Sequence, residues 1–274
     1  VLAHPLDDDF HRGRSPVWDK ITVPLLSAAN WGGQGLHPRG NFEGFTEPAS
    51  EQKWLEVHGL EHWTHFYTDY GRELQLRFFD YFLKGVDNGW DKQPPVQLQI
   101  RHVDRFVERH ENEWPLARTQ WTKLYLDPAR RMLQWNPVAD EARISYRALG
   151  EGSTFVTAPL KEEIEITGPV ALKLFLASST IDADLFAVLR VFDPDGNEVD
   201  FQGALDPHTP IANGWLRASH RKLDPELTRE YRPYHAHDEY QPLVRGDVYE
   251  LDVEIWPTCI VVPAGYQIAL TLLG

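Results

Sequence analysis

The sequence predicts an α/β part followed by an all-β part, and a change in hydrophobic periodicity supports this division. In the first hundred residues, short apolar runs alternate with segments of helical periodicity, an order typical of a parallel α/β sheet. Further along, apolar residues recur at every second position in many short segments separated by Pro, Gly and Asp. That pattern favours a β-sandwich or jelly roll. We therefore expect an α/β part at residues 1–100 and a jelly-roll β-sandwich at residues 101–274.

The first part opens with a strand and a helix in the order that the α/β pattern requires. The apolar run at 23–29 is typical of a buried parallel strand. A helix-like segment follows, with Pro38 near its start and with Phe42 and Phe45 three positions apart. The segment at 53–59, "KWLEVHG", reads as the next strand, so we expect a second parallel strand there.

The clearest helix in the sequence covers residues 68–85. Thr68 or Asp69 can cap its start, and Lys84 and Gly85 are suited to its end by charge and by backbone freedom. Apolar residues at helical spacing form one stripe along this segment: Tyr70, Leu74, Phe78, Tyr81 and Phe82. The stripe predicts that one face of the helix packs on the sheet.

The second part reads as a series of short strands. The segments with a period of two are 96–102, 120–127, 142–149, 169–178, 184–193, 214–221, 247–256 and 266–273. Leu251, Val253 and Ile255 alternate with acidic residues, which indicates one buried and one wet face. The 184–193 segment is almost continuously apolar, so we expect a central strand there.

Composition limits the partners and the compartment. The chain carries 41 acidic and 27 basic residues and a formal charge of -14, which argues against a nucleic-acid or anionic-membrane surface. No apolar run approaches the roughly 20 residues of a membrane span, so we expect no membrane-spanning helix, and we expect no signal peptide. The one cysteine, Cys259, excludes an internal disulfide and suits a reducing compartment, so we expect a cytoplasmic protein. The chain starts without Met and ends within a strand pattern, so we expect it to be a fragment of a longer polypeptide.

Three histidines follow the second predicted strand, and two of them, His58 and His62, frame a glutamate as H-x-x-E-H. That is the spacing of an inverted zinc-peptidase motif, which places both imidazoles on one face of a helix. Here Gly59 stands inside the motif, at a cost of roughly 1 kcal/mol in a helix, and the preceding residues favour a strand. We therefore expect no metal and no other cofactor at this position.

A histidine just past a parallel strand also fits a catalytic base. Ligands and catalytic groups of open α/β sheets gather at the carboxyl ends of the strands. An acid-bearing loop followed by a histidine-bearing loop is the end of the Ser, Asp, His order of α/β-hydrolases. The alternative is that His58, His62 and His65 are ordinary loop residues packed on Trp63 and Phe66.

Six segments together resemble the X-Pro dipeptidyl-peptidase (S15) and cocaine esterase family of acyl hydrolases. They are "HPLDDDFHRGRSPVWDKITVPLL", "NWGGQGLHPRGNFEGF", "EHWTHFYTDYGRELQLRFFDYFLKGVDNGW", "DADLFAVLRVFDPDG", "GWLRASHRKLDP" and "VEIWPT". The resemblance implies the C-terminal part of an α/β-hydrolase domain followed by a jelly roll of galactose-binding-like form. It also implies hydrolysis of an ester or amide through an acyl-serine intermediate.

The resemblance assigns the catalytic histidine and leaves the other groups open. His62 is the best match to the family histidine, and His58 is the second choice. The family serine lies upstream of this region, and Ser153 in "GEGST" lacks the second glycine of a nucleophile elbow. We therefore expect the nucleophile and the oxyanion hole to lie in a missing N-terminal segment.

The expected acid is replaced. Relatives typically read strand-x-W-x-D at the first loop, but Gly33 stands at the position of that aspartate. A glycine cannot orient an imidazole. Either the triad is incomplete or another carboxylate reaches in, the candidates being Glu61, Asp69 and Glu43.

Two smaller patterns have structural explanations. The segment 193–197 with Asp182 and Asp184 suggests a calcium loop, but its glycine comes too early for an EF-hand, so a hairpin turn is the better interpretation. Trp215, Trp256 and Tyr266 could line a sugar groove, and we expect them instead to fill the sandwich or the interface between the two parts.

The sequence thus favours part of a serine acyl hydrolase that acts on a small-molecule ester or amide or on a peptide. The alternative is a catalytically inactive homologue whose jelly roll works as a binding or interaction module, and Gly33 motivates it. Nucleic-acid and membrane partners are not expected, and oligomer formation is left open.

Overall fold

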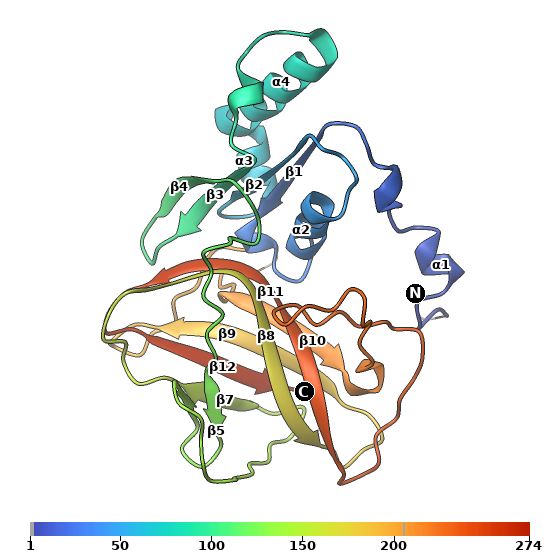
Figure 1. Cartoon of the computed structure of the whole chain (residues 1–274). Coiled ribbons are helices and arrows are strands. Elements are labelled where there is room, and N and C mark those ends of the chain that lie inside the picture. The colour runs from blue at the N-terminus through green and yellow to red at the C-terminus, as the bar shows by residue number, and fades with distance from the viewer. Residues whose placement is uncertain (1–2, 205) are drawn as a thin grey trace.

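The computed structural model describes residues 3–204 and 206–274, which form a small α/β layer above a larger curled β-sheet (Figure 1). The upper sheet has four strands in the order β1-β2-β3-β4. Its strands are β1 (Leu25–Asn30), β2 (Lys53–His58), β3 (Val96–Arg101) and β4 (Phe106–Glu111). The β1–β2 and β2–β3 pairs are parallel and β3–β4 is antiparallel. The predicted parallel pairing of the first two strands is therefore confirmed.

Four α-helices lie in the first part of the described chain: α1 (Asp9–Arg12), α2 (Pro38–Thr46), α3 (His62–Tyr67) and α4 (Asp69–Lys84). Short 3₁₀ turns occur at η1 (Trp18–Lys20), η2 (Trp31–Gly33), η3 (Trp90–Lys92) and η4 (Ala218–His220). Helix α4 confirms its prediction, because Thr68 caps the start and Gly85 adopts the left-handed conformation after the end. Of its apolar stripe, Leu74 and Phe78 are buried.

The lower sheet is mostly antiparallel and has eight strands in the order β5-β6-β7-β12-β9-β10-β11-β8. Its strands are β5 (Tyr125–Asp127), β6 (Met132–Gln134), β7 (Ser153–Val156), β8 (Ile164–Ala177), β9 (Asp184–Phe192), β10 (Ala212–Arg217), β11 (Val248–Val262) and β12 (Gln267–Leu273). As predicted, β9 lies inside the sheet, and the apolar side of β11 is buried.

Two strand predictions in the lower sheet were wrong. Residues 142–149 form no strand, because Ile144 and Tyr146 pack against the core without backbone pairing. Of the predicted strand at 120–127, only the last three residues form a strand, β5. The short strands β4, β6 and β7 were missed.

The two sheets share buried apolar residues. One cluster combines residues of the upper layer, among them Trp31 and Phe42, with Cys259 and Val261 of β11. The side chain of Arg101 donates hydrogen bonds from the end of β3 to the carbonyl oxygens of Cys259 (2.7 Å) and Ile211 (2.8 Å). The boundary at residue 100 stays a prediction, since the upper sheet continues through β4.

The smaller patterns resolve into turns and packing. The Asp193 carboxylate accepts hydrogen bonds from the backbone of Asp195 (2.9 Å) and Asn197 (2.8 Å), so this segment is the expected turn. Tyr266 packs against the core as predicted. The expectation was wrong for Trp215, which is 42% exposed and contacts Trp256 on the outer face of the sheet.

Candidate functional site

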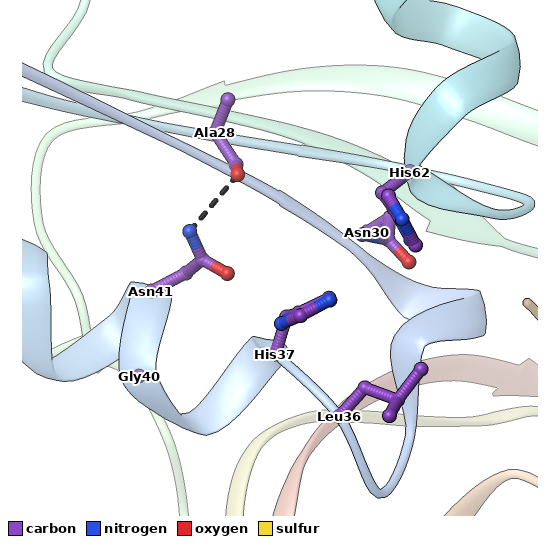
Figure 2. Close-up of a pocket in the computed structure, with 7 residues that line it drawn as sticks. All are labelled: Ala28, Asn30, Leu36, His37, Gly40, Asn41 and His62. Carbon is purple, nitrogen blue, oxygen red and sulfur yellow. Dashed lines mark hydrogen bonds between the residues drawn. The ribbon is translucent and has the colours of Figure 1, made fainter.

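The carboxyl ends of β1 and β2 meet at one edge of the upper sheet. Because the two strands are parallel and in register, their last residues, Asn30 and His58, are direct neighbours. Loops leave the sheet at this edge toward α2 and α3, as expected for the ligand-binding edge of an open α/β sheet. Between these loops lies a pocket of about 430 Å³, lined by Ala28, Asn30, Leu36, His37, Gly40, Asn41 and His62 (Figure 2).

His62 faces this pocket from the first turn of α3 (Figure 2). Its ring contacts His37 edge to face, with 5.0 Å between the ring centroids. Its Nδ1 atom is buried and has no hydrogen-bond partner among the described residues. An imidazole with a buried Nδ1 and an open pocket in front can exchange a proton with a group bound in that pocket.

Asn30 occupies the space that a side chain at position 33 would need. A Cβ atom on Gly33 would lie 2.8 Å from Asn30 Oδ1 and 3.2 Å from Pro38 Cδ. Asn30 is 2% exposed, and its Oδ1 is buried with no partner among the described residues. The glycine at position 33 therefore leaves room for the amide of Asn30.

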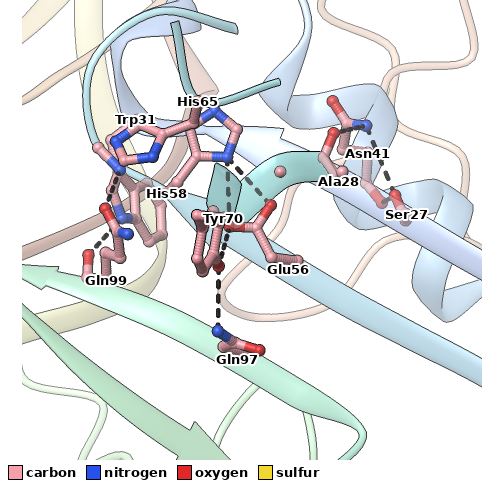
Figure 3. A network of polar contacts seen from close by, with 12 residues as sticks. Ser27, Ala28, Trp31, Asn41, Glu56, His58, His65, Tyr70, Gln97 and Gln99 are labelled. Atoms are coloured by element: carbon pink, nitrogen blue, oxygen red, sulfur yellow. Dashed lines mark hydrogen bonds and ion pairs between the residues drawn. The ribbon is translucent and has the colours of Figure 1, made fainter. Parts of the chain in front are cut away.

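His58 lies in a different environment, inside a buried polar network (Figure 3). Its Nδ1 is 3.0 Å from Oε2 of Glu56, whose Oε1 accepts a 2.9 Å hydrogen bond from the Tyr70 hydroxyl. Gln97 Nε2 donates to the same hydroxyl at 3.0 Å. Burial raises the pKa of Tyr70, and the neighbouring Glu56 raises it further, so the phenol stays protonated as a donor.

The residues of this network do not line the pocket. His58 is 6% exposed, and His65 covers its ring with 4.9 Å between centroids. Burial lowers the pKa of His65, and His58 lowers it further. His58 thus pairs with a carboxylate but does not line the pocket. His62 lines the pocket, and no carboxylate of the described residues is hydrogen-bonded to its ring.

The geometry of a zinc motif is not formed. His58 ends strand β2 and His62 begins helix α3, so the two imidazoles do not share a helical face. Leu60 between them has a φ of 59°, which breaks any continuous helix. Within residues 3–204 and 206–274, no group of three His, Cys, Asp or Glu is arranged to hold a metal ion.

The three carboxylates considered as partners of the catalytic histidine differ in their burial and in the groups that they bind. Asp69 is exposed and pairs with Arg72 at 3.0 Å, and Glu43 binds Arg232 at 2.7 Å. Glu61 is buried and accepts a hydrogen bond from Thr64. Burial opposes its ionisation, but this bond, its own backbone and the nearby His65 and His62 hold the pKa of Glu61 below its usual value. Glu61 supplies negative charge near His62 without a hydrogen bond to its ring.

The loop before α3 is held by backbone contacts from both parts. Gly32 N donates to the carbonyl of Leu60 at 2.9 Å, and Ala204 N donates to the carbonyl of Gly32 at 2.9 Å. A Cβ on Gly32 would lie 2.4 Å from the Leu60 oxygen and 2.7 Å from the Gln202 oxygen. The glycine thus allows three chain segments to meet directly beside the pocket.

The sequence analysis missed His37, Asn30 and Asn41 as pocket residues. Asn30 directly follows the predicted strand at 23–29, so the rule that ligands gather at strand ends could have selected it. His37 precedes Pro38 at the start of α2, and only the packing of α2 beside β1 brings it to His62.

Comparison with known proteins identifies the family of this chain. Residues 88–274 match the family described as the X-Pro dipeptidyl-peptidase C-terminal non-catalytic domain. The chain therefore belongs to that family. The match covers the lower sheet together with β3 and β4, while the pocket lies in the preceding residues.

Curated relatives and solved structures are hydrolases. A provisionally named serine esterase of Mycobacterium bovis is 28% identical over 75% of this chain and 36% of its own length. The cocaine esterase of a Rhodococcus species is 24% identical over 71% of this chain and 36% of its own length. The chain thus spans about a third of these relatives. A CocE/NonD family hydrolase from Staphylococcus aureus superposes with a TM-score of 0.96 and 32% identity, over 100% of this chain and 50% of that protein.

Across the described ranges, none of the helices is both long and apolar enough to cross a bilayer.

Proposed function

We propose that this chain is the C-terminal part of a serine acyl hydrolase and that His62 is its general base. The observation that carries the proposal is the position of His62, which faces a pocket at the carboxyl ends of two parallel strands. Membership of a family whose relatives are esterases and dipeptidyl-peptidases supports the same chemistry. A base at this edge meets the nucleophile of a neighbouring strand in hydrolases of this order.

The proposed reaction uses His62 twice. Its Nε2 takes the proton of a serine hydroxyl while the serine oxygen attacks the carbonyl carbon of an ester or amide. The protonated ring then returns the proton to the leaving alcohol or amine, and an acyl-serine remains. Water attacks this acyl group by the same path, releasing the acid and restoring the serine. No cofactor is required.

The serine and the oxyanion hole would come from a segment upstream of these residues. The chain covers half of the S. aureus hydrolase, which leaves room for such a segment in a protein of that length. Ser153 does not fit the role, because it is 3% exposed within β7 and its Oγ is buried.

His58 remains the second choice for the base. Its pairing with Glu56 at 3.0 Å resembles the acid–histidine pair of a triad. Its burial beneath His65 argues for a supporting role instead, because a base must reach the proton that it removes.

We propose that the lower sheet is a jelly roll of galactose-binding-like form that braces the pocket. Arg39 of α2 binds Glu254 of β11 at 2.9 Å, and Gln34 donates to the carbonyl of Pro257 at 3.4 Å. These contacts tie the pocket loop at 34–39 to the curled sheet. The substrate class that fits is a small ester or amide, or a peptide, since a pocket of this size suits a small acyl group.

The test uses the longer protein that contains this chain. A fluorophosphonate probe and p-nitrophenyl acetate turnover are applied to the wild type, to His62→Ala and to His208→Ala, a control whose side chain is 75% exposed. We expect His62→Ala to lower kcat/KM at least about a hundredfold, because it removes general base catalysis. The control should behave as the wild type. Mapping of the labelled peptide should place the reactive serine outside these 274 residues.

Each other result has a defined meaning. Equal labelling and turnover in the wild type and His62→Ala would remove His62 from the mechanism, and loss in His58→Gln alone would transfer the role to His58. A wild type that neither labels nor hydrolyses would favour the inactive homologue that serves as an interaction module.

A further inference from the structure

Two unsatisfied polar atoms lie in the same pocket and complement each other. Nδ1 of His62 and Oδ1 of Asn30 are both buried, and neither has a hydrogen-bond partner among the described residues. Both residues line this pocket, and their side chains overlap in the view of Figure 2. One atom can donate a proton and the other can accept it. A buried polar atom without a partner costs about 1–3 kcal/mol, so both gain by pairing.

We propose that Asn30 is the positioning residue of His62 and replaces the carboxylate of the usual triad. A rotation of either side chain lets His62 Nδ1–H donate to Asn30 Oδ1. That bond would hold the ring in the tautomer with Nδ1 protonated and Nε2 free to accept the serine proton. This inference rests on the proposed role of His62 as base.

The surrounding backbone is shaped for this arrangement. Oδ1 of Asn30 lies 2.8 Å from the point where a Gly33 Cβ would stand, so any side chain at position 33 would displace the amide. Gly33 is not among the described glycines with positive φ, so backbone conformation does not account for a glycine there. The absence of a side chain at position 33 is thus what leaves room for the amide of Asn30.

The other charged and titratable groups near His62 do not supply this bond. Glu61 precedes it on the chain and is engaged by Thr64, and His37 contacts the ring from the start of α2. The second pocket amide, Asn41, donates to the carbonyl of Ala28 at 2.9 Å and is held by Ser27. Among these groups, Asn30 alone combines a buried oxygen that has no partner among the described residues with a place in the pocket that His62 lines.

The tautomer of His62 gives a direct test that does not depend on turnover. In ¹⁵N-histidine spectra of the longer protein that contains this chain, at neutral to alkaline pH, the wild type should show His62 with Nδ1 protonated and Nε2 unprotonated. Asn30→Ala should shift His62 toward the Nε2–H form that free imidazole side chains prefer. Asn30→Asp should keep the Nδ1–H form, and Asn41→Ala should match the wild type.

Activity of the longer protein gives the second readout. Asn30→Ala should lower kcat about tenfold with KM nearly unchanged. This loss is smaller than the one expected for His62→Ala, because the base is still present and only its orientation is lost. Asn30→Asp should restore kcat and move the acidic limb of the pH–rate profile to higher pH, because a carboxylate favours the charged ring. A wild-type His62 in the Nε2–H form, or an unchanged tautomer in Asn30→Ala, would overturn the role of Asn30. Loss of turnover in His62→Ala alongside either result would leave the proposed function standing.

Discussion

At the scale of single residues, Asn30 and Gly33 share one space beside the pocket. Asn30 and Gly33 lie one helical turn apart in the loop that leaves β1. The Asn30 amide fills the space that a side chain at position 33 would occupy. Trp31 between them is fully buried and donates from Nε1 to the carbonyl of Gln99 at 2.7 Å. The indole fixes the loop on β3, so the amide and the glycine hold constant positions.

This shared space predicts strong coupling between positions 30 and 33. Gly33→Asp alone should destabilise the fold by roughly 1–3 kcal/mol, because its Cβ overlaps Asn30 Oδ1. Asn30→Ala opens that space, so the double variant should be more stable than the sum of the single changes predicts, by about 1 kcal/mol or more. Urea unfolding of the four proteins measures the coupling. Additive free energies of unfolding would show that the two side chains do not compete for this space.

At the scale of elements, the short α3 and the long α4 are joined by a very close backbone approach. Thr68 ends the first helix and caps the second, and its hydroxyl donates to the carbonyl of His65 at 2.7 Å. A Cβ on Gly71 would lie 2.1 Å from the His65 oxygen and 2.8 Å from that of Phe66. The position of His62 on α3 therefore depends on a glycine in the first turn of α4.

Glycine-to-alanine changes in two helices should have opposite signs. Gly71→Ala should destabilise the protein by roughly 2 kcal/mol or more, since the clash with a backbone oxygen exceeds the gain of about 1 kcal/mol in helix propensity. Gly44→Ala in α2 meets only Ser27 Oγ at 3.7 Å, so it should stabilise by about 0.5–1 kcal/mol. Thermal and urea unfolding compare the two variants. A stabilising Gly71→Ala would show that α3 moves freely away from α4.

Elements defined by local signals were predictable, and those defined by distant partners were not. Helix α4 carries its cap, its apolar stripe and its terminal glycine within one segment, so sequence alone located it. Ile144 and Tyr146 show the right alternation for a strand, yet neither segment end finds a pairing partner. In the site, the edge position of His62 followed from chain order, whereas its contact with His37 depends on how α2 packs.

At the scale of the whole molecule, a buried arginine connects the two sheets. Arg101 is fully buried at the end of β3, and no described carboxylate binds it. Burial lowers the pKa of Arg101 to about 10, so it stays charged at neutral pH. Its guanidinium lies 4.8 Å from the ring centroid of Phe201, which adds a cation–π contact. The pocket loops bridge the same two sheets, so their geometry depends on this connection.

Removal of this guanidinium should weaken the junction more than an average surface change. Arg101→Met deletes hydrogen bonds to the Cys259 and Ile211 carbonyls and to Thr258, so we expect a loss of about 2–4 kcal/mol. The variant no longer has to bury a charged guanidinium, and this gain limits the loss of stability to the upper end of that range. The control Arg105→Met breaks only an exposed pair with Asp104 and should change stability by less than about 0.5 kcal/mol. Urea unfolding, followed by tryptophan fluorescence, measures both variants. Equal midpoints for Arg101→Met and the wild type would mean that apolar packing around Trp31 and Val261 alone holds the sheets together.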